Sequence, residues 1–349
     1  MSGAKKFGRA ARFESLEVRQ LLAGDVLVNV MRGNLVIQGD AADNEIAIAA
    51  GAEPGSFVVT GLNGTTVHQN GQSPASEITV TGVRRDVRIG MGEGNDSVSI
   101  GGVRVRGDLL VRTGAGNDEV SIDDSGIGGR LAIGTDGDND SVAIGSEAAA
   151  GTMPTDELEG ALRVRKGIHV DLGTGNDTLT LDQVATSIGV GVNGGSGDDS
   201  ISANVARGTV FAVLGGDGTD TISLADLRAR HLGVHAGAGD DDVSIQNSVF
   251  ATLGVALGEG DDMLSIGGNQ ARIAVLLGGA GVDTLEAPIE NEFRFKFVRG
   301  FEVPEDANSN TPIPRALADL LDRLDDVSEE RLRSLLAGLV GGWTPPRRR

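Results

Sequence analysis

One loop pattern recurs along the chain and constrains the fold more than any other feature of the sequence. The pattern is G-x-G-x-D followed by alternating apolar residues, and the steps between its aspartates are 22, 22, 37, 22, 21, 21, 21 and 21 residues. These aspartates are Asp96, Asp118, Asp140, Asp177, Asp199, Asp220, Asp241, Asp262 and Asp283. A fixed period of about 20 to 50 residues is typical of stacked supersecondary units and not of a single globular core.

Apolar residues alternate on both sides of every loop in the same register. In the first clear repeat Val87 and Ile89 precede the loop, and Val98 and Ile100 follow it. A period of two indicates β-strands, so each repeat is predicted to be a strand, a glycine loop and a second strand. The prediction is an all-β fold, a right-handed parallel β-helix or β-roll-like solenoid with 21–22 residues per turn. The seven or eight residues left in each turn allow either three short faces or a flatter two-sheet roll.

The ends of the repeat array divide the chain into four predicted parts. Residues 1–24 form a leader, 25–85 an N-terminal β capping region, 86–303 the solenoid of nine repeats, and 304–349 a linker with C-terminal helices. In the capping region Asn44 stands where the recurring Asp belongs, as expected of a degenerate terminal unit. The step of 37 residues predicts an insert near 145–163 that projects from the rod.

Two further segments have patterns of their own. Phe293, Phe295 and Phe297 alternate, which predicts a closing strand whose large side chains plug the open end of the core. Leucines at helical spacing in 317–324 and 332–339 predict a short C-terminal helical hairpin.

The loops resemble the calcium-binding nonapeptide repeat G-G-x-G-x-D-x-U-x of RTX (haemolysin-type) proteins. Three loops, 194–199, 215–220 and 278–283, match all four fixed positions. One departure is that the family usually places a loop every nine residues, on both sides of a roll, whereas here there is one loop per turn. The resemblance implies several Ca²⁺ ions held by the nine aspartates and by these loop glycines: Gly92, Gly94, Gly114, Gly116, Gly173, Gly175, Gly195, Gly197, Gly216, Gly218, Gly237, Gly239, Gly258, Gly260, Gly279 and Gly281.

Physical chemistry supports a cation at these loops without reference to the family. Rungs about 4.8 Å apart would place the aspartates in one file, where neighbouring charges repel by about 3.5 kcal/mol at an effective dielectric of 20. Calcium takes six to eight oxygen ligands, both carboxylates and carbonyls. The alternative is that each Asp only accepts backbone N–H bonds to hold its turn, with Asn95, Asn117 and Asn176 doing likewise.

Composition restricts the classes of partner and of chemistry. The formal net charge of −20 disfavours nucleic acid and anionic membrane surfaces, and no apolar run is long enough to predict a transmembrane segment. The chain has no cysteine, hence no disulfide or thiolate chemistry. His169, His231 and His235 fall at outward strand positions, so no catalytic site is predicted.

Residues 13–22, Phe-Glu-Ser-Leu-Glu-Val-Arg-Gln-Leu-Leu, resemble the LEPR-XLL motif of planctomycete-type surface and secreted proteins, with Val18 in place of its Pro. That resemblance implies an extracellular or cell-surface location; a short amphipathic helix capping the solenoid is the alternative. We therefore expect a calcium-binding structural or adhesive scaffold, with surface or matrix polymers or other proteins as partners. A metal-free interaction solenoid and a carbohydrate-active β-helix enzyme are the other two classes.

Overall fold

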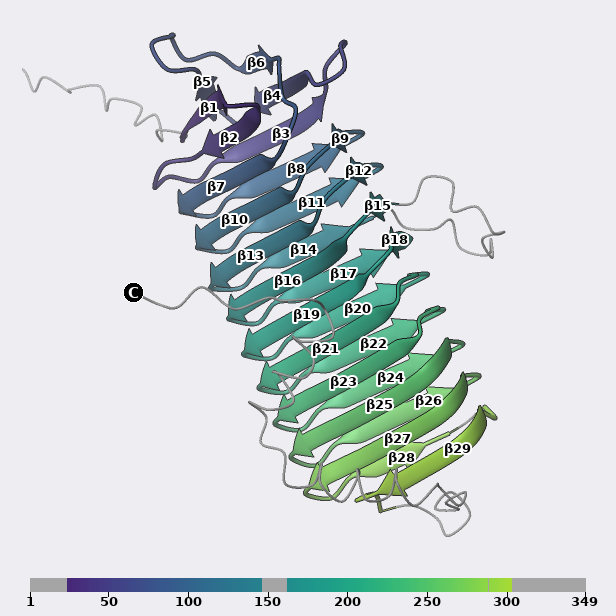
Figure 1. Cartoon of the computed structure of the whole chain (residues 1–349). Helices are drawn as coiled ribbons and strands as arrows, with labels where there is room; N and C mark the ends of the chain where they lie inside the picture. Colours follow the sequence, from purple (N-terminus) through teal and green to yellow (C-terminus); the bar gives the residue numbers. More distant parts are fainter. Residues whose placement is uncertain (1–23, 146–161, 288, 303–349) are drawn as a thin grey trace, which may run out of the picture.

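The computed structural model describes residues 24–145, 162–287 and 289–302, and every regular element in these ranges is a β-strand. They form an elongated parallel solenoid (Figure 1), which confirms the all-β parallel solenoid predicted from the repeat. The leader at 1–23, the insert at 146–161 and the predicted helical hairpin after residue 303 lie outside the described residues. The described residues contain no helix with the length and apolarity needed to span a bilayer.

Two long sheets run the length of the solenoid. The 13-stranded sheet has the order β29 (Glu292–Arg299), β27 (Gln270–Ala280), β25 (Val249–Glu259), β23 (His231–Ala238), β21 (Val210–Asp217), β19 (Gly189–Ser196), β16 (Gly167–Thr174), β13 (Leu131–Gly137), β10 (Leu109–Ala115), β7 (Val87–Glu93), β2 (Asn34–Gln38), β1 (Asp25–Met31), β5 (Thr66–His68). The 12-stranded sheet has the order β28 (Thr284–Glu286), β26 (Met263–Gly267), β24 (Asp242–Gln246), β22 (Thr221–Ala225), β20 (Ser200–Asn204), β17 (Thr178–Asp182), β14 (Ser141–Ile144), β11 (Glu119–Asp123), β8 (Ser97–Gly101), β3 (Glu45–Ala50), β4 (Phe57–Gly61), β6 (Glu77–Val80).

A third, narrow sheet completes each turn. Its strands are only two or three residues long: β18 (Val184–Thr186), β15 (Leu162–Val164), β12 (Gly126–Ile127) and β9 (Arg104–Val105). Beyond β18 it continues as single parallel bridges from Ala185 to Arg207, from Arg207 to Arg228 and from Arg228 to Val249. The cross-section therefore has two long faces and one narrow face, and one strand of each makes up a rung.

The core is a stack of identical positions, because the strands pair in parallel and in register. Val87 pairs with Leu109 and Leu109 with Leu131, and all three are buried. Exposed or half-buried residues alternate with them along each strand. Branched aliphatic side chains thus fill the interior rung by rung, as the alternation in the sequence predicted.

The two ends of the solenoid are built differently from its middle. At the N-terminal end β2 and β3 form a first rung in parallel with β7 and β8, and they are covered by antiparallel strands: β1 pairs with β2, β4 with β3, and β6 with β4. Antiparallel cover ends the parallel stack, so it blocks further strand addition at this edge.

At the C-terminal end β29 is the predicted closing strand, but the prediction of a phenylalanine plug is wrong for two of three residues. Phe295 and Phe297 pair with Ile273 and Val275 of β27, which are not core positions, whereas Phe293 pairs with the buried Ala271 and packs against the core. The alternation of β27 changes phase between Ala271 and Ala274, and β29 follows it. In β29 the core position is occupied by Val298, which pairs with the buried Leu276, and not by Phe295 or Phe297.

Candidate functional site

The recurring aspartates lie at one edge of the solenoid, where each glycine loop joins the 13-stranded sheet to the 12-stranded sheet. Each is the residue immediately before a strand of the 12-stranded sheet, as Asp96 is before β8 and Asp199 before β20. All nine are at most 3 % exposed. The single file predicted from the period is therefore present, but its carboxyl groups are buried at the corner of the core.

A signal for this inward orientation is present in the sequence. Asp96 stands two residues before Val98 and four before Ile100, and both of these are buried. Side chains two apart along a strand share a face. The aspartate before each strand therefore continues the inward row, and the residue just before it, such as Asn95, points outward and is exposed.

The buried aspartates form a continuous hydrogen-bond ladder. The Oδ1 atom of each accepts the backbone N–H of the equivalent residue one rung closer to the N-terminus, over 2.7–3.2 Å. The series begins at Asn44, whose N–H donates to Asp96. Each aspartate then donates its own N–H to the next one, in the order Asp96, Asp118, Asp140, Asp177, Asp199, Asp220, Asp241, Asp262 and Asp283. The insert does not interrupt it, because Asp140 still donates to Asp177.

A second ladder runs along the outside of the same loops in the opposite direction. Here the side-chain Oδ1 of one rung accepts the backbone N–H of the next rung toward the C-terminus, over 2.6–3.1 Å. The acceptors are Asp43, Asn95, Asn117, Asn139, Asn176, Asp198, Asp240 and Asp261. Asn95, Asn117 and Asn176 thus accept backbone N–H bonds, but from the neighbouring rung and not from their own turn, as the alternative had assumed. Thr219 is the one position between Asp43 and Asp261 where the described loops lack this bond.

The glycines of the loops are required by the backbone. All sixteen predicted glycines have φ between 109° and 138°. At Gly116 (φ 125°) a Cβ atom would also collide with the carbonyl of Gly94 on the preceding rung. The loop ending at Asp140 adopts positive φ (71°) without glycine, at Asp136 and Asp138. This loop therefore carries backbone strain that the other loops avoid.

Burial makes the ionised form of each recurring aspartate unfavourable. Within the described part of the chain, Oδ2 of all nine is buried and has no hydrogen-bond partner. Desolvation raises the pKa of each carboxyl group, and at most rungs the charges of neighbouring aspartates add to this, whereas the hydrogen bond from the backbone N–H lowers the pKa. The net result is a pKa raised to about 7 for Asp96, Asp140, Asp199 and Asp241, to about 6 for Asp220 and Asp262, and upward for Asp118, Asp177 and Asp283. The hydroxyl of Thr113 lowers the pKa of Asp118 but does not complete a hydrogen bond with it.

An orphaned, buried carboxylate oxygen is a group that a cation could satisfy, so the stacked aspartates are compatible with calcium-binding loops. The described residues do not, however, bring together three or more His, Cys, Asp or Glu side chains that could hold a metal ion. In six of the nine loops the first position carries a side chain that is itself buried, such as Leu172 or Leu257. Only in the three loops that match the full motif is that position glycine, at Gly194, Gly215 and Gly278, where Oδ2 faces a backbone carbonyl of the next rung. The described residues therefore supply a carboxylate and a carbonyl at those three loops, and no complete calcium shell.

The histidines lie on the 13-stranded sheet at the outward positions predicted for them, and they do not form a cluster. His169 lies in β16, where burial lowers its pKa, and His231 and His235 lie in β23. His231 is within 2.6 Å of the Thr252 hydroxyl. None of these contacts joins a histidine to the aspartate ladder.

Comparison with known proteins does not place this chain in a family: no protein-family model, no curated protein and no solved structure matches it. The geometry described above is therefore the basis for the functional argument.

Proposed function

We propose that this protein is an elongated structural scaffold whose rungs are joined at one edge by the two opposed hydrogen-bond ladders. The observation that carries the proposal is the use of the recurring aspartates: every one accepts a backbone N–H from a neighbouring rung. This is the metal-free class of function considered from the sequence. The regular rod, with one repeated loop and no unique cleft of catalytic side chains among the described residues, favours a scaffold over an enzyme.

We place this scaffold outside the cell or on its surface. The support for this location is the resemblance of residues 13–22 to a sorting motif of surface and secreted proteins. The acidic composition, at a formal net charge of −20, also suits a protein that stays soluble as a long rod.

Calcium binding is the second candidate, and one observation favours it. The nine Oδ2 atoms are buried without partners among the described residues, and a cation would offset the burial that raises the pKa of these carboxyl groups and the repulsion that adds to it at most rungs. If ions bind, the geometry favours the loops of Asp199, Asp220 and Asp283, where glycine leaves the first loop position without a side chain.

Thermal melting of the whole protein at pH 8, with EDTA or with added calcium, separates the two candidates. The metal-free scaffold melts at the same temperature in both. Calcium binding would raise the melting temperature in calcium, and Asp199→Asn would then lose part of that rise while the exposed control Asp198→Asn on the adjoining position would keep more of it. A calcium-dependent rise that Asp199→Asn reduces and Asp198→Asn leaves larger would overturn the metal-free scaffold.

A further inference from the structure

The narrow sheet carries a strip of positive charge on an otherwise acidic protein. Across six successive rungs its segments, 103–107, 125–129, 162–166, 184–188, 206–209 and 227–230, contain eight basic residues and no Asp or Glu. We call these eight residues the basic strip: Arg104, Arg106, Arg163, Arg165, Lys166, Arg207, Arg228 and Arg230. A local positive field on a chain of net charge −20 is concentrated here by the fold, because these residues lie up to 126 positions apart in the sequence.

The register of the narrow sheet aligns several of these arginines in one column. Arg104 pairs with Gly126, Gly126 with Arg163, Arg163 with Ala185, and Ala185 with Arg207. From Arg104 to Arg207 arginines therefore alternate with small residues and stand two rungs, or about 9.6 Å, apart. Arg207 then pairs directly with Arg228, one rung farther along.

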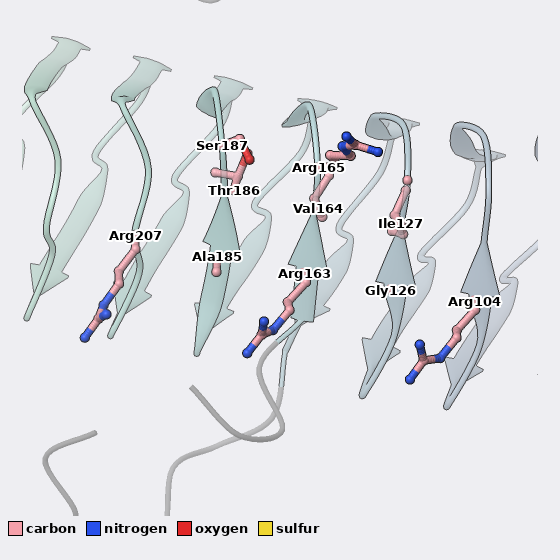
Figure 2. A pocket seen from close by; sticks show the side chains of 11 residues that line it. Arg104, Gly126, Ile127, Arg163, Val164, Arg165, Ala185, Thr186, Ser187 and Arg207 are labelled. Carbon is pink, nitrogen blue, oxygen red and sulfur yellow. The ribbon is translucent and has the colours of Figure 1, made fainter. Parts of the chain in front are cut away.

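A shallow groove of about 590 Å³ follows this column. Arg104, Arg163, Arg165 and Arg207 line it together with the hydroxyl residues Thr186 and Ser187. Figure 2 shows that Arg104, Arg163 and Arg207 project in the same direction from their rungs, whereas Arg165 lies farther along the rung of Arg163 and points away from them. Within the described residues Arg104, Arg165 and Arg207 form no ion pair, so their donors are available to a ligand.

We propose that the basic strip binds an extended acidic polysaccharide whose carboxylates recur along the chain, such as one uronic acid in each disaccharide. Guanidinium groups match carboxylates in a two-bond geometry, and hydroxyl residues between them suit the hydroxyl groups of sugars. The proposal names a partner for the scaffold role above and rests on the rungs being stacked as described.

Nucleic acid fits the strip less well. Duplex DNA carries one charge per about 1.7 Å of its axis, which is denser than eight basic residues spread over six rungs about 4.8 Å apart, and the acidic body would repel it. The six segments also contain no aromatic residue on which bases could stack.

Binding of hyaluronan oligosaccharides, which carry one carboxylate per disaccharide, tests the proposal on the full-length protein in calcium-free buffer. Neutral dextran and duplex DNA are the comparison ligands. We expect hyaluronan to bind at low salt, dextran not to bind, and DNA to bind more weakly than hyaluronan. The double variant Arg104→Gln with Arg207→Gln should weaken binding by about tenfold and lower the slope of log K against log salt by roughly 2.

The matched control is the double variant Arg88→Gln with Arg112→Gln. Both residues lie in the 13-stranded sheet outside the strip, so the change in net charge is the same. An equal loss in both double variants would overturn the proposal, as would no hyaluronan binding, equal binding of dextran, or tighter binding of DNA. Thermal melting of each variant reports the scaffold separately, so a failure of the polysaccharide site is distinguishable from a failure of the stacked fold.

Discussion

Replacing Asp199 by Asn separates the two roles of a buried ladder residue, its shape and its charge. Its Oδ1 accepts the N–H of Asp177 over 2.9 Å, and its Oδ2 is buried without a partner among the described residues. Asparagine keeps the Oδ1 acceptor and removes the charge. Asn44, at the same loop position of the first rung, shows that an amide nitrogen there can find an acceptor, because it donates to the Ala42 carbonyl. At Asp199 the carbonyl of Gly215 lies on the same side as Oδ2 and offers an equivalent acceptor.

The sign of the pH dependence follows from the pKa of Asp199, which burial raises from 3.8 to about 7. The folded protein holds this proton more tightly than the unfolded chain does. Its contribution to stability is therefore fully present below about pH 4 and is lost as the pH rises through about 7. The difference in pKa corresponds to about 4 kcal/mol when the group is fully charged.

We expect Asp199→Asn to recover about half of the stability lost on ionisation, on the order of 2 kcal/mol at pH 8. The recovery is incomplete because a charge-assisted hydrogen bond is exchanged for a neutral one. For a domain of this size that is a rise in melting temperature of roughly 4–8 °C. At pH 5 wild-type Asp199 is already protonated in the fold, so most of the gain should disappear.

Thermal melting followed by circular dichroism at pH 5 and pH 8, with EDTA present throughout, measures the rise in melting temperature at pH 8 and its loss at pH 5. The control is Asp198→Asn, which removes the same charge from an exposed residue and keeps the acceptor for the Thr219 N–H. Our reasoning is refuted if Asp199→Asn destabilises the protein equally at both pH values, or if Asp198→Asn gives the same pH-dependent gain.

Three further substitutions, one of them with a control substitution, test other parts of the edge by the same melts. Asp199→Ala removes the acceptor as well as the charge and leaves the buried N–H of Asp177 without a partner, so we expect a loss of about 1–3 kcal/mol at pH 5, where the charge plays no part; an unchanged melt would contradict the ladder. Gly116→Ala should cost at least about 2 kcal/mol because of its positive φ and the Gly94 carbonyl, whereas Gly134→Ala, whose Cβ would meet only the Asp171 carbonyl oxygen at 3.9 Å, should change stability by less than about 0.5 kcal/mol. Thr219→Asn supplies the missing acceptor for the Asp240 N–H and should stabilise the protein by about 1 kcal/mol; a neutral or negative effect would argue against the outer ladder.

The period of the sequence was sufficient to predict the solenoid and the inward aliphatic rows, because equal spacing and alternation leave few other ways to bury Val87, Leu109 and Leu131. The number of faces was left open, since strands of two or three residues such as β9 and β12 are too short to show alternation. The orientation of Asp96 was readable from its parity with Val98. The assumption that an acidic residue faces water, strong as a general rule, leads to the opposite expectation here.

The phenylalanine plug illustrates the limit of pattern reading at an end of the stack. Alternation at Phe293, Phe295 and Phe297 fixes only that the three share a face while the strand stays regular. The phase change in β27 between Ala271 and Ala274 is shared with the preceding rung, where β25 changes phase between Phe250 and Leu253. No residue in the closing strand itself signals it.

The two ladders also explain which residues mark the ends of the array. A residue of the inner ladder, the one formed by the buried aspartates, accepts an N–H from the rung before it. The described first rung has no equivalent loop before it, and there the Oδ1 of Asn44 accepts the N–H of Asp40 in its own loop. A residue of the outer ladder, the one on the outside of the loops, accepts an N–H from the rung after it. In the loop that ends at Asp283 this position is occupied by Val282, which donates its N–H to Asp261 and has no side-chain acceptor. Within the described rungs, the inner ladder therefore lacks an acceptor at its N-terminal end and the outer ladder lacks one at its C-terminal end. Hydrogen bonds between rungs account for this opposite placement of Asn44 and Val282, whereas a column of independent ion sites gives no reason for it; Thr219 is the remaining gap, within the outer ladder.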